Sequence, residues 1–249
     1  MRRLLPIAAV ATVPALLGAG AMIFLYAPPD AVQGDVQRIF YVHVSSVIAA
    51  YFCFAAVLLG GAAYLWRGYL AGDRLARAAA PVGLVLTAVC LLMGSIWARP
   101  IWGVYWTWDA RLTSTLVLFM VYAGYLLVRR LASSPASAAR LGAVVGIVGF
   151  VDVPVVHGSV EWWRTVHPQP IIDAANGPQM PPQMTITFLV TLAAFTLLTA
   201  VLVAVRYQIE ESKEEIAELR RLEEEAEVPV AARAAGPALA AKEAGWAAR

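Results

Sequence analysis

The chain has 249 residues, of which 60% are hydrophobic and only 14% are charged, and its mean hydropathy is +0.68. A soluble domain is about 45–50% apolar and about 25% charged, so this composition excludes a soluble enzyme, a nucleic-acid-binding domain and a disulfide-stapled secreted module. Residues 1–207 carry 13 Lys and Arg against 7 Asp and Glu (+6), whereas residues 208–249 carry 6 against 10 (−4). This asymmetry indicates a basic membrane domain followed by an acidic polar tail.

Six apolar runs divide residues 1–207, and each is about long enough to cross a hydrocarbon core of about 30 Å as a helix. Helix is expected rather than strand because the runs do not alternate and because lipid forces the backbone to satisfy its own hydrogen bonds. The expected spans are Leu4–Tyr26, Val44–Trp66, Ala79–Trp97, Leu112–Val128, Leu141–Val160 and Met184–Tyr207. A cleaved signal peptide is the alternative for the first run, but its apolar core exceeds the usual length of about 7–15 residues. We therefore predict an all-α protein, a six-transmembrane-helix bundle.

The arginines predict how the bundle is oriented. Nine of them fall on one side of the expected spans, and four fall on the other, namely Arg38, Arg99, Arg111 and Arg164. Basic residues are enriched in cytoplasmic loops, so both termini are predicted to lie in the cytoplasm. Residues 27–42, 98–111 and 161–183 then face outward.

The acidic tail is expected to have two parts. Residues 208–228 contain no Gly or Pro and place opposite charges at helical spacing, which predicts a charged cytoplasmic helix. Residues 229–249 are rich in Ala and Gly and are predicted to be disordered. The six-helix domain is thus expected to occupy residues 1–207.

All three histidines of the chain fall at or near the outer side of this topology. His43 comes at the start of the second span, His157 near the outer end of the fifth, and His167 in the last outer loop. Taken singly, each has the alternative interpretation of a hydrogen-bonded histidine at the membrane interface. Together they are candidate ligands on one face of the membrane.

One outer loop is unusually rich in aromatic residues. Four large rings fall within seven positions, at Trp102, Tyr105, Trp106 and Trp108. The aromatic belt at the membrane interface explains one or two such residues at a helix end, whereas this density suits a flat apolar ligand. Asp109 closes the run, and it is equally a candidate N-cap of the fourth span.

A flat macrocycle with a metal at its centre would use both features. Imidazole binds haem iron axially, and an aromatic surface can cover the porphyrin. The haem propionates need cationic or hydrogen-bonding partners, and charge-assisted pairing with arginine is the strongest of these. The candidate partners are the outer arginines, Arg38, Arg99, Arg111 and Arg164.

The segment Trp102–Asp109 resembles the WGxxWxWD signature of the haem-handling (WWD-domain) protein superfamily. More narrowly, the chain is similar to the CcmC family of the system I cytochrome c maturation pathway, and its six spans and short length resemble CcmC better than the larger CcmF. Tyr105 stands where the signature often has Trp, and it keeps an aromatic face. The similarity covers roughly Gln37–Tyr207. The supporting stretches are Gln37–Val44, Trp108–Ser114 and His157–His167.

The resemblance implies non-covalent binding of haem b at the outer face, with His43 and His167 as axial ligands of the iron. Trp102, Trp106, Trp108 and Asp109 would belong to the loop that cradles the haem, with Tyr105 among them. The resemblance also implies a protein of the bacterial cytoplasmic (inner) membrane that is not an enzyme and that presents haem to the chaperone CcmE. Its expected partners are the transporter subunits CcmA and CcmB and the small subunit CcmD.

His157 is expected to be structural or to support a ligand rather than to bind iron itself. It shares the fifth span with Asp152, an acid that is costly in a membrane unless it is paired or hydrated. Two other classes of membrane protein stay open. A b-type cytochrome that exchanges electrons with quinone would usually need four histidines at two depths, and it should turn over with a quinol donor. A small-solute permease would use Asp152 as its substrate or proton site, so replacing that residue should abolish transport while sparing haem.

Overall fold

The computed structural model describes residues 4–163, 165–167, 172–173 and 177–227. Within this part of the chain, six helical segments are long and apolar enough to cross a membrane, which confirms the predicted all-α, six-helix fold class. The chain divides between Tyr207 and Gln208 into two compact units, and the packing and the site described below belong to the first. The predicted disordered residues, 229–249, lie outside the described residues.

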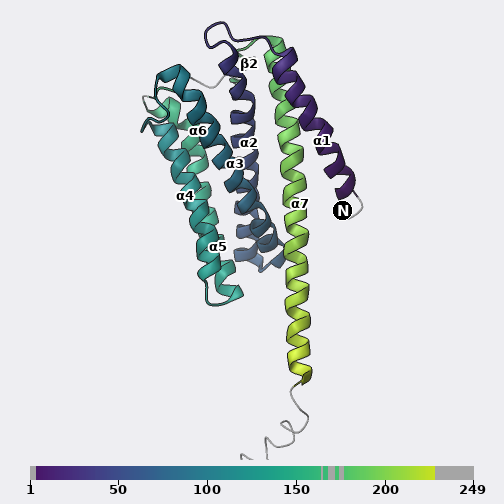
Figure 1. Cartoon of the computed structure of the whole chain (residues 1–249). Helices are drawn as coiled ribbons and strands as arrows, with labels where there is room; N and C mark the ends of the chain where they lie inside the picture. The colour runs from purple at the N-terminus through teal and green to yellow at the C-terminus, as the bar shows by residue number, and fades with distance from the viewer. Residues whose placement is uncertain (1–3, 164, 168–171, 174–176, 228–249) are drawn as a thin grey trace, which may run out of the picture. The chain divides into compact units, whose positions relative to one another are not determined.

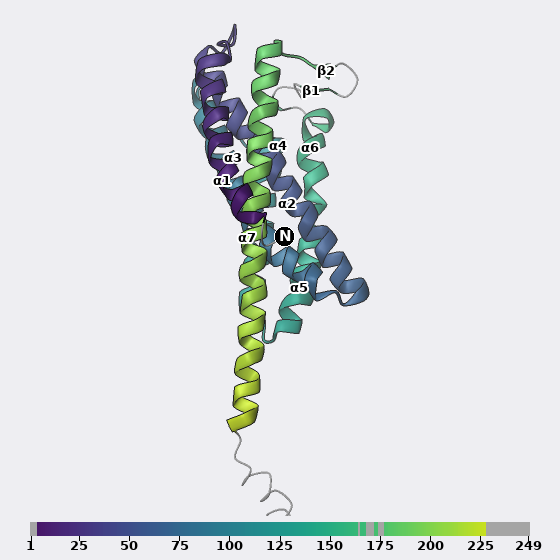
Figure 2. The same ribbon diagram turned by 90° about the vertical axis from the view of Figure 1, so that its right-hand side faces the viewer.

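The elements follow one another in a simple order (Figure 1). They are α1 (Leu5–Ala21), the π-helical turn η1 (Met22–Tyr26), the 3-10 turn η2 (Asp35–Arg38), α2 (Ile39–Arg67), α3 (Leu70–Trp102), α4 (Ala110–Leu131), α5 (Pro135–Phe150), α6 (Asp152–Trp162), β1 (Ile172–Asp173), β2 (Gly177–Pro178) and α7 (Pro182–Glu227). The two short strands pair antiparallel. α1 and α7 lie side by side on one flank of α2, and α4 and α6 lie on the other flank (Figures 1 and 2).

The helices extend beyond the apolar runs that predict them. α2 begins at Ile39 rather than Val44, and α3 begins at Leu70 rather than Ala79. Hydropathy marks the part of a helix that suits hydrocarbon, whereas the backbone hydrogen bonding continues into the polar flanks. As a result His43 lies inside α2, one turn beyond its first residue.

The fifth predicted span is two helices rather than one. α5 ends at Phe150 and α6 begins at Asp152. Pro154 has no N–H to offer the carbonyl of Phe150, four residues earlier, and its ring crowds that carbonyl. At the break, Val151 N instead donates to Val148 O at 3.1 Å, one residue short of an α-helical bond. α6 therefore forms a separate element at the end of the bundle where α2 begins.

The pair α2 and α3 is held by direct backbone contact. A Cβ at Gly60 of α2 would lie 2.3 Å from the carbonyl oxygen of Gly72 in α3, so only glycine fits there. Small residues let membrane helices approach in this way, and dispersion then stabilises the pair. Gly68 makes the turn between the two helices, with φ at +68° and its N–H bonded to Tyr64 O.

Aromatic packing joins α2 to the helices on the other flank. Phe54 of α2 stacks on Tyr122 of α4, with ring centroids 3.7 Å apart and planes at 13°. The Tyr122 hydroxyl donates to Gly146 O of α5 at 3.1 Å. Near the start of α3, Asp73 forms a bidentate pair with Arg129 of α4, at 2.7 and 3.0 Å. These contacts fix α2, α3 and α4, which carry much of the site described next.

Candidate functional site

A cavity of about 450 Å³ lies at the end of the bundle where α2 begins and α3 ends, and we call this the histidine end. The volume is within the range of about 300–1,000 Å³ for small-molecule sites. The lining is mostly apolar and comes from α2, α3, α4, α6 and α7, together with the connecting residues Gln33, Trp106, Val166 and His167. All three histidines, His43, His157 and His167, line this one cavity.

The imidazole of His43 is oriented by the neighbouring helix α3. Its Nδ1 lies 2.9 Å from Cys90 O, and because a carbonyl oxygen only accepts, Nδ1 is the donor. A Cβ at Gly94 would lie 2.8 Å from the Cε1 atom of His43, so the ring rests directly on the α3 backbone. Cys90 and Gly94 are four residues apart and so share a helix face. In the neutral imidazole with its proton on Nδ1, the lone pair of Nε2 is left to coordinate a metal.

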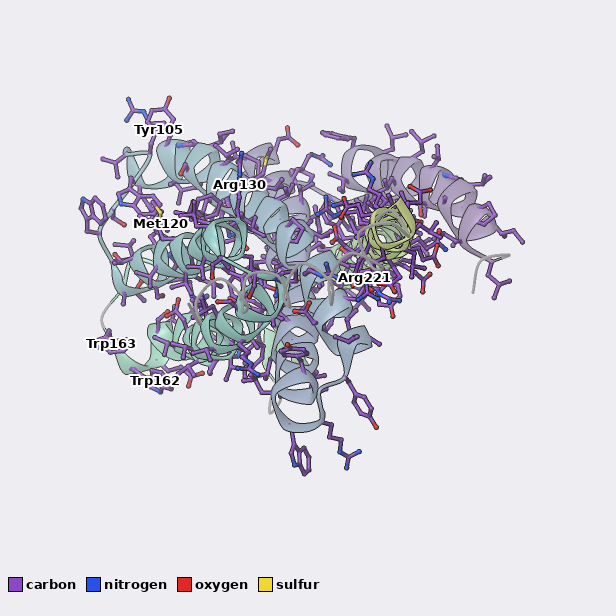
Figure 3. The ribbon with its side chains drawn as sticks, turned by 90° about the horizontal axis from the view of Figure 1, so that it is seen from below. Tyr105, Met120, Arg130, Trp162, Trp163 and Arg221 are labelled. Carbon is purple, nitrogen blue, oxygen red and sulfur yellow. The ribbon has the colours of Figure 1, made fainter. Side chains whose placement is uncertain are left out.

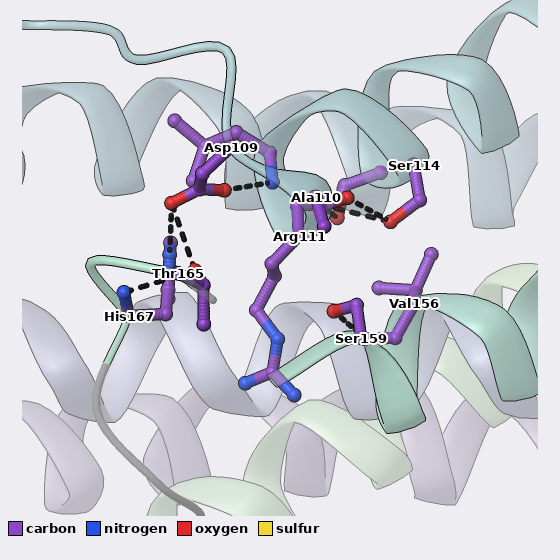
Figure 4. A network of polar contacts seen from close by, with 10 residues as sticks. Asp109, Ala110, Arg111, Ser114, Val156, Ser159, Thr165 and His167 are labelled. Carbon is purple, nitrogen blue, oxygen red and sulfur yellow. Dashed lines mark hydrogen bonds and ion pairs between the residues drawn. The ribbon is translucent and has the colours of Figure 1, made fainter. Parts of the chain in front are cut away.

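Asp109 connects the aromatic loop to His167 (Figure 4). Its Oδ1 accepts from Leu112 N at 2.9 Å, which confirms the predicted N-cap of α4. Its Oδ2 accepts from Thr165 Oγ1 at 3.0 Å and lies 3.5 Å from His167 Nδ1. The backbone N–H of His167 donates to Thr165 Oγ1 at 3.1 Å, and the Trp102 ring meets the imidazole edge to face at 5.1 Å. This histidine therefore also has its Nδ1 engaged and its Nε2 available.

The pKa values of both groups in this contact lie below their ordinary values, for different reasons. Burial lowers the pKa of the His167 imidazole, and the nearby Asp109 only partly offsets that effect. Burial acts to raise the pKa of the Asp109 carboxyl, but the hydrogen bonds from Leu112 N and Thr165 Oγ1, together with His167, outweigh it and hold that pKa below its usual range. Near neutral pH the pair is therefore a neutral imidazole beside a carboxylate.

Two imidazoles, each paired through Nδ1 with an oxygen, show the pattern of metal-binding histidines with their supporting partners. The described residues contain no group of three or more His, Cys, Asp or Glu that could hold a bare metal ion. The arrangement instead fits an iron that already has four ring nitrogens and needs only axial ligands. An apolar cavity beside Trp102 and Trp106 fits the macrocycle that would carry it.

Three of the other residues predicted for the site lie on the cavity wall, namely Trp102, Trp106 and Arg111. Arg111 donates from Nη2 to His157 O at 2.8 Å, while its buried Nε has no hydrogen-bond partner in the described part of the chain. The buried Nε1 of Trp106 is without a partner among those same residues. Such unpaired donors are suited to a carboxylate ligand.

The remaining predicted arginines are engaged elsewhere. Arg38 pairs with Asp35 at 2.9 Å. Arg99 donates to the carbonyl of Gly103, the residue that caps the C-terminus of α3. Neither lines the cavity. Arg164 lies outside the described residues.

The other aromatic residues of the loop turn away from the cavity. Tyr105 is 61% exposed and Trp108 is 76% exposed, and neither is part of the cavity wall. Trp108 packs edge to face on Trp106 at 5.6 Å, so it buttresses a wall residue. Figure 3 shows Tyr105, Trp162 and Trp163 projecting from the periphery of the bundle, where their exposure agrees with the aromatic-belt interpretation.

The sequence interpretation missed the residues that hold His43. Cys90, Gly94 and Trp97 all line the cavity from α3, yet they precede the tryptophan-rich loop. Their spacing of three and four residues on one helix face is the signal that groups them. The partner of His43 is a backbone carbonyl, which every residue type has, so the sequence could not identify it.

Comparison with known proteins agrees with the family that the motifs predict. The family model described as "Heme exporter protein C" (CcmC) matches residues 1–222. The Heme exporter protein C of Bradyrhizobium diazoefficiens is 40% identical over 210 residues, which cover 83% of this chain and 79% of the relative. The protein of that name from Haemophilus influenzae is 34% identical over 203 residues (80% and 82%), and the one from Escherichia coli strain K12 is 37% identical over 164 residues (66% and 66%). The chain therefore belongs to the Heme exporter protein C (CcmC) family.

Proposed function

We propose that this protein binds haem b non-covalently at the histidine end of its membrane bundle, with His43 and His167 as the two axial ligands. The observation that carries this proposal is the single cavity that both histidines line, with Trp102 and Trp106 beside them. Each imidazole has its Nδ1 engaged, by a carbonyl or a carboxylate, and each can offer Nε2 to iron. The relatives are named Heme exporter protein C, which agrees with this ligand.

The protein's own residues hold the haem rather than activate it. Two histidines fill both axial positions, so no open coordination site is left on the iron for chemistry. Trp102 and Trp106 cover the ring by apolar contact, and Arg111, which lines the cavity, supplies a cation for a propionate. The protein is thus a haem-handling protein and not an enzyme.

Delivery requires one ligand to leave, and His167 is the ligand we assign to this step. His43 belongs to the regular backbone of α2, whereas His167 follows α6 outside a helix. Its side chain is held by Asp109 and its backbone by Thr165, so few bonds must break for it to move. The recipient is the haem chaperone CcmE, and CcmA, CcmB and CcmD are the partners in the membrane.

The predicted topology completes the proposal. The protein is a multi-pass membrane protein with six spans. We place it in the bacterial inner membrane with the histidine end on the outer face and both termini in the cytoplasm, since the excess of arginine lies at the opposite loops. Haem is then presented on the side where c-type cytochromes are assembled.

Purified protein tests the ligand assignment. The parent is expected to co-purify with haem that acid and organic solvent extract, and to show the absorption spectrum of a six-coordinate iron. His43→Ala and His167→Ala should each lose that spectrum, and added imidazole should restore it. His157→Ala is the matched control and should keep it. If both ligand variants keep the parent's six-coordinate spectrum, the assignment is wrong.

A further inference from the structure

The orientation of the His43 ring is not determined by its hydrogen bond alone. The bond from Nδ1 to Cys90 O fixes one atom of the imidazole, but the torsion that turns a histidine ring is soft and broadly populated. Gly94 forms a floor beneath Cε1. The Cys90 Sγ lies 3.6 Å from Nδ1 and 4.0 Å from Nε2. On another side of the ring is Trp97, whose indole lies edge to face against the imidazole at 5.8 Å and 70°.

Trp97 is itself held by a polar contact from outside the helix bundle. Its Nε1 donates to the side-chain Oε1 of Gln33 at 2.9 Å, across 64 residues of sequence. Phe40 packs on the same indole at 6.3 Å and 69°. Gln33 and Trp97 both line the cavity, so this hydrogen bond closes part of the cavity wall next to a proposed ligand.

The backbone that carries Gln33 is shaped for this contact. Asp30 Oδ1 accepts from Val32 N at 2.9 Å and from Gln33 N at 2.8 Å. Asp30 and Gly34 exchange two backbone hydrogen bonds, and Gly34 takes a φ of +61° that other residues rarely adopt. These bonds form a tight turn, here called the Asp30 turn (residues 30–34), which presents the Gln33 side chain to α3.

Arg38 bridges the two ends of the segment that contains this turn. Its guanidinium donates to the carbonyls of Ile23 and Ala27, the second at 3.2 Å, and pairs with Asp35. The arginine therefore connects η1 to the start of α2. Contacts therefore run from the Asp30 turn through Gln33 and Trp97 to His43, and the Asp30 turn lies in the segment that Arg38 bridges.

We infer that Trp97, anchored by Gln33, is a positioning residue that sets the plane of the His43 imidazole for axial ligation of the haem iron. This inference rests on the proposed function. The plane of an axial imidazole decides how its π orbitals overlap with the iron d orbitals. The ferric low-spin spectrum therefore reports the ring's orientation separately from whether the haem is bound.

The experiment compares haem-loaded parent, Trp97→Phe, Gln33→Ala and the double variant by electron paramagnetic resonance in the ferric state. Trp97→Phe keeps a ring beside His43 but removes the Nε1–H that Gln33 accepts. We expect both single variants to shift the g values in the same direction. Each should also weaken haem binding by about 10-fold, at the low end for loss of a partner that supports a ligand. Because both act through one hydrogen bond, the double variant should resemble Trp97→Phe alone.

The control is Trp66→Phe, which changes an indole that is 82% exposed near the end of α2, far along the helix from His43. It should leave the g values unchanged. Parent-like g values in both Trp97→Phe and Gln33→Ala, or additive shifts in the double variant, would overturn the positioning role. The proposed function fails by a different result, namely a parent without haem or a His43→Ala variant with the parent spectrum.

Discussion

Replacing Asp109 with Asn separates two functions that one carboxylate performs in this structure. Oδ1 caps α4 through Leu112 N, while Oδ2 binds Thr165 and His167. Asn caps a helix about as well as Asp, so the substitution keeps the cap. It removes the negative charge beside the imidazole, and with it the support that a carboxylate gives to a histidine ligand.

The expected magnitude follows from the geometry of the contact. The Asp109 and His167 side chains are only 8% and 17% exposed, so solvent screens their interaction weakly. Loss of such a supporting partner lowers metal affinity about 10–100-fold, which is about 1.4–2.7 kcal/mol. Asp109→Asn should therefore weaken haem binding by this factor and leave the free energy of unfolding nearly unchanged. Asp109→Ala should show the same loss of affinity and also lose about 1 kcal/mol of stability with the cap.

Haem titration followed by absorbance, together with thermal unfolding in detergent, measures both quantities. The reasoning is refuted if Asp109→Asn binds haem as tightly as the parent does. A result in which only Asp109→Ala loses affinity would make Asp109 a helix cap and nothing more.

Asp109→Asn should also change the pKa of His167. In haem-free protein the pKa of His167 should lie below its ordinary value of 6.5 because of burial, and Asp109 raises it toward that value. Asp109→Asn should lower the pKa of His167 further, which nuclear magnetic resonance of the imidazole protons can follow. As pH falls below 6.5, the unfolded chain takes up this proton before the folded chain does, so stability should decline until the folded pKa is reached. A His167 titration midpoint that is higher in Asp109→Asn than in the parent would contradict this account.

Two further substitutions test the packing. Gly94→Ala places a Cβ 2.8 Å from Cε1 of His43, a clash of about 1–3 kcal/mol that should weaken haem binding about 10–100-fold. The control is Gly124→Ala, whose Cβ meets nothing within 4 Å and which should bind haem like the parent. Equal haem affinity of the two variants would argue against the close contact between Gly94 and His43. Arg129→Ala removes the bidentate partner of Asp73, where both side chains are mostly buried. Because Arg77 Nε stays 3.3 Å from the same carboxylate, the cost should be at most about 3 kcal/mol, the low end for a broken buried pair. Thermal unfolding in detergent measures this loss, Asp73→Asn should recover part of it in the same background, and an unchanged unfolding midpoint would mean that the pair contributes little.

The sequence alone determined the membrane fold, because a spanning helix is a local property. About 20 continuous apolar residues must form a helix in lipid, whatever surrounds them. The six spans therefore followed from hydropathy, and only their ends and one interior break differed. That break also has a local cause in Pro154, although the sequence does not say whether a proline bends a span or divides it.

Which side chains meet at the cavity was decided by the tertiary structure. Four arginines shared the outer side by sequence, yet of Arg38, Arg99 and Arg111 only the last lines the cavity. The partner of His43 is a backbone carbonyl 47 residues away, which any residue type could supply. The contact between Trp97 and Gln33 likewise depends on a turn that brings two distant segments together. Residue type determines what a side chain can bind, but only the packing of helices determines what it reaches.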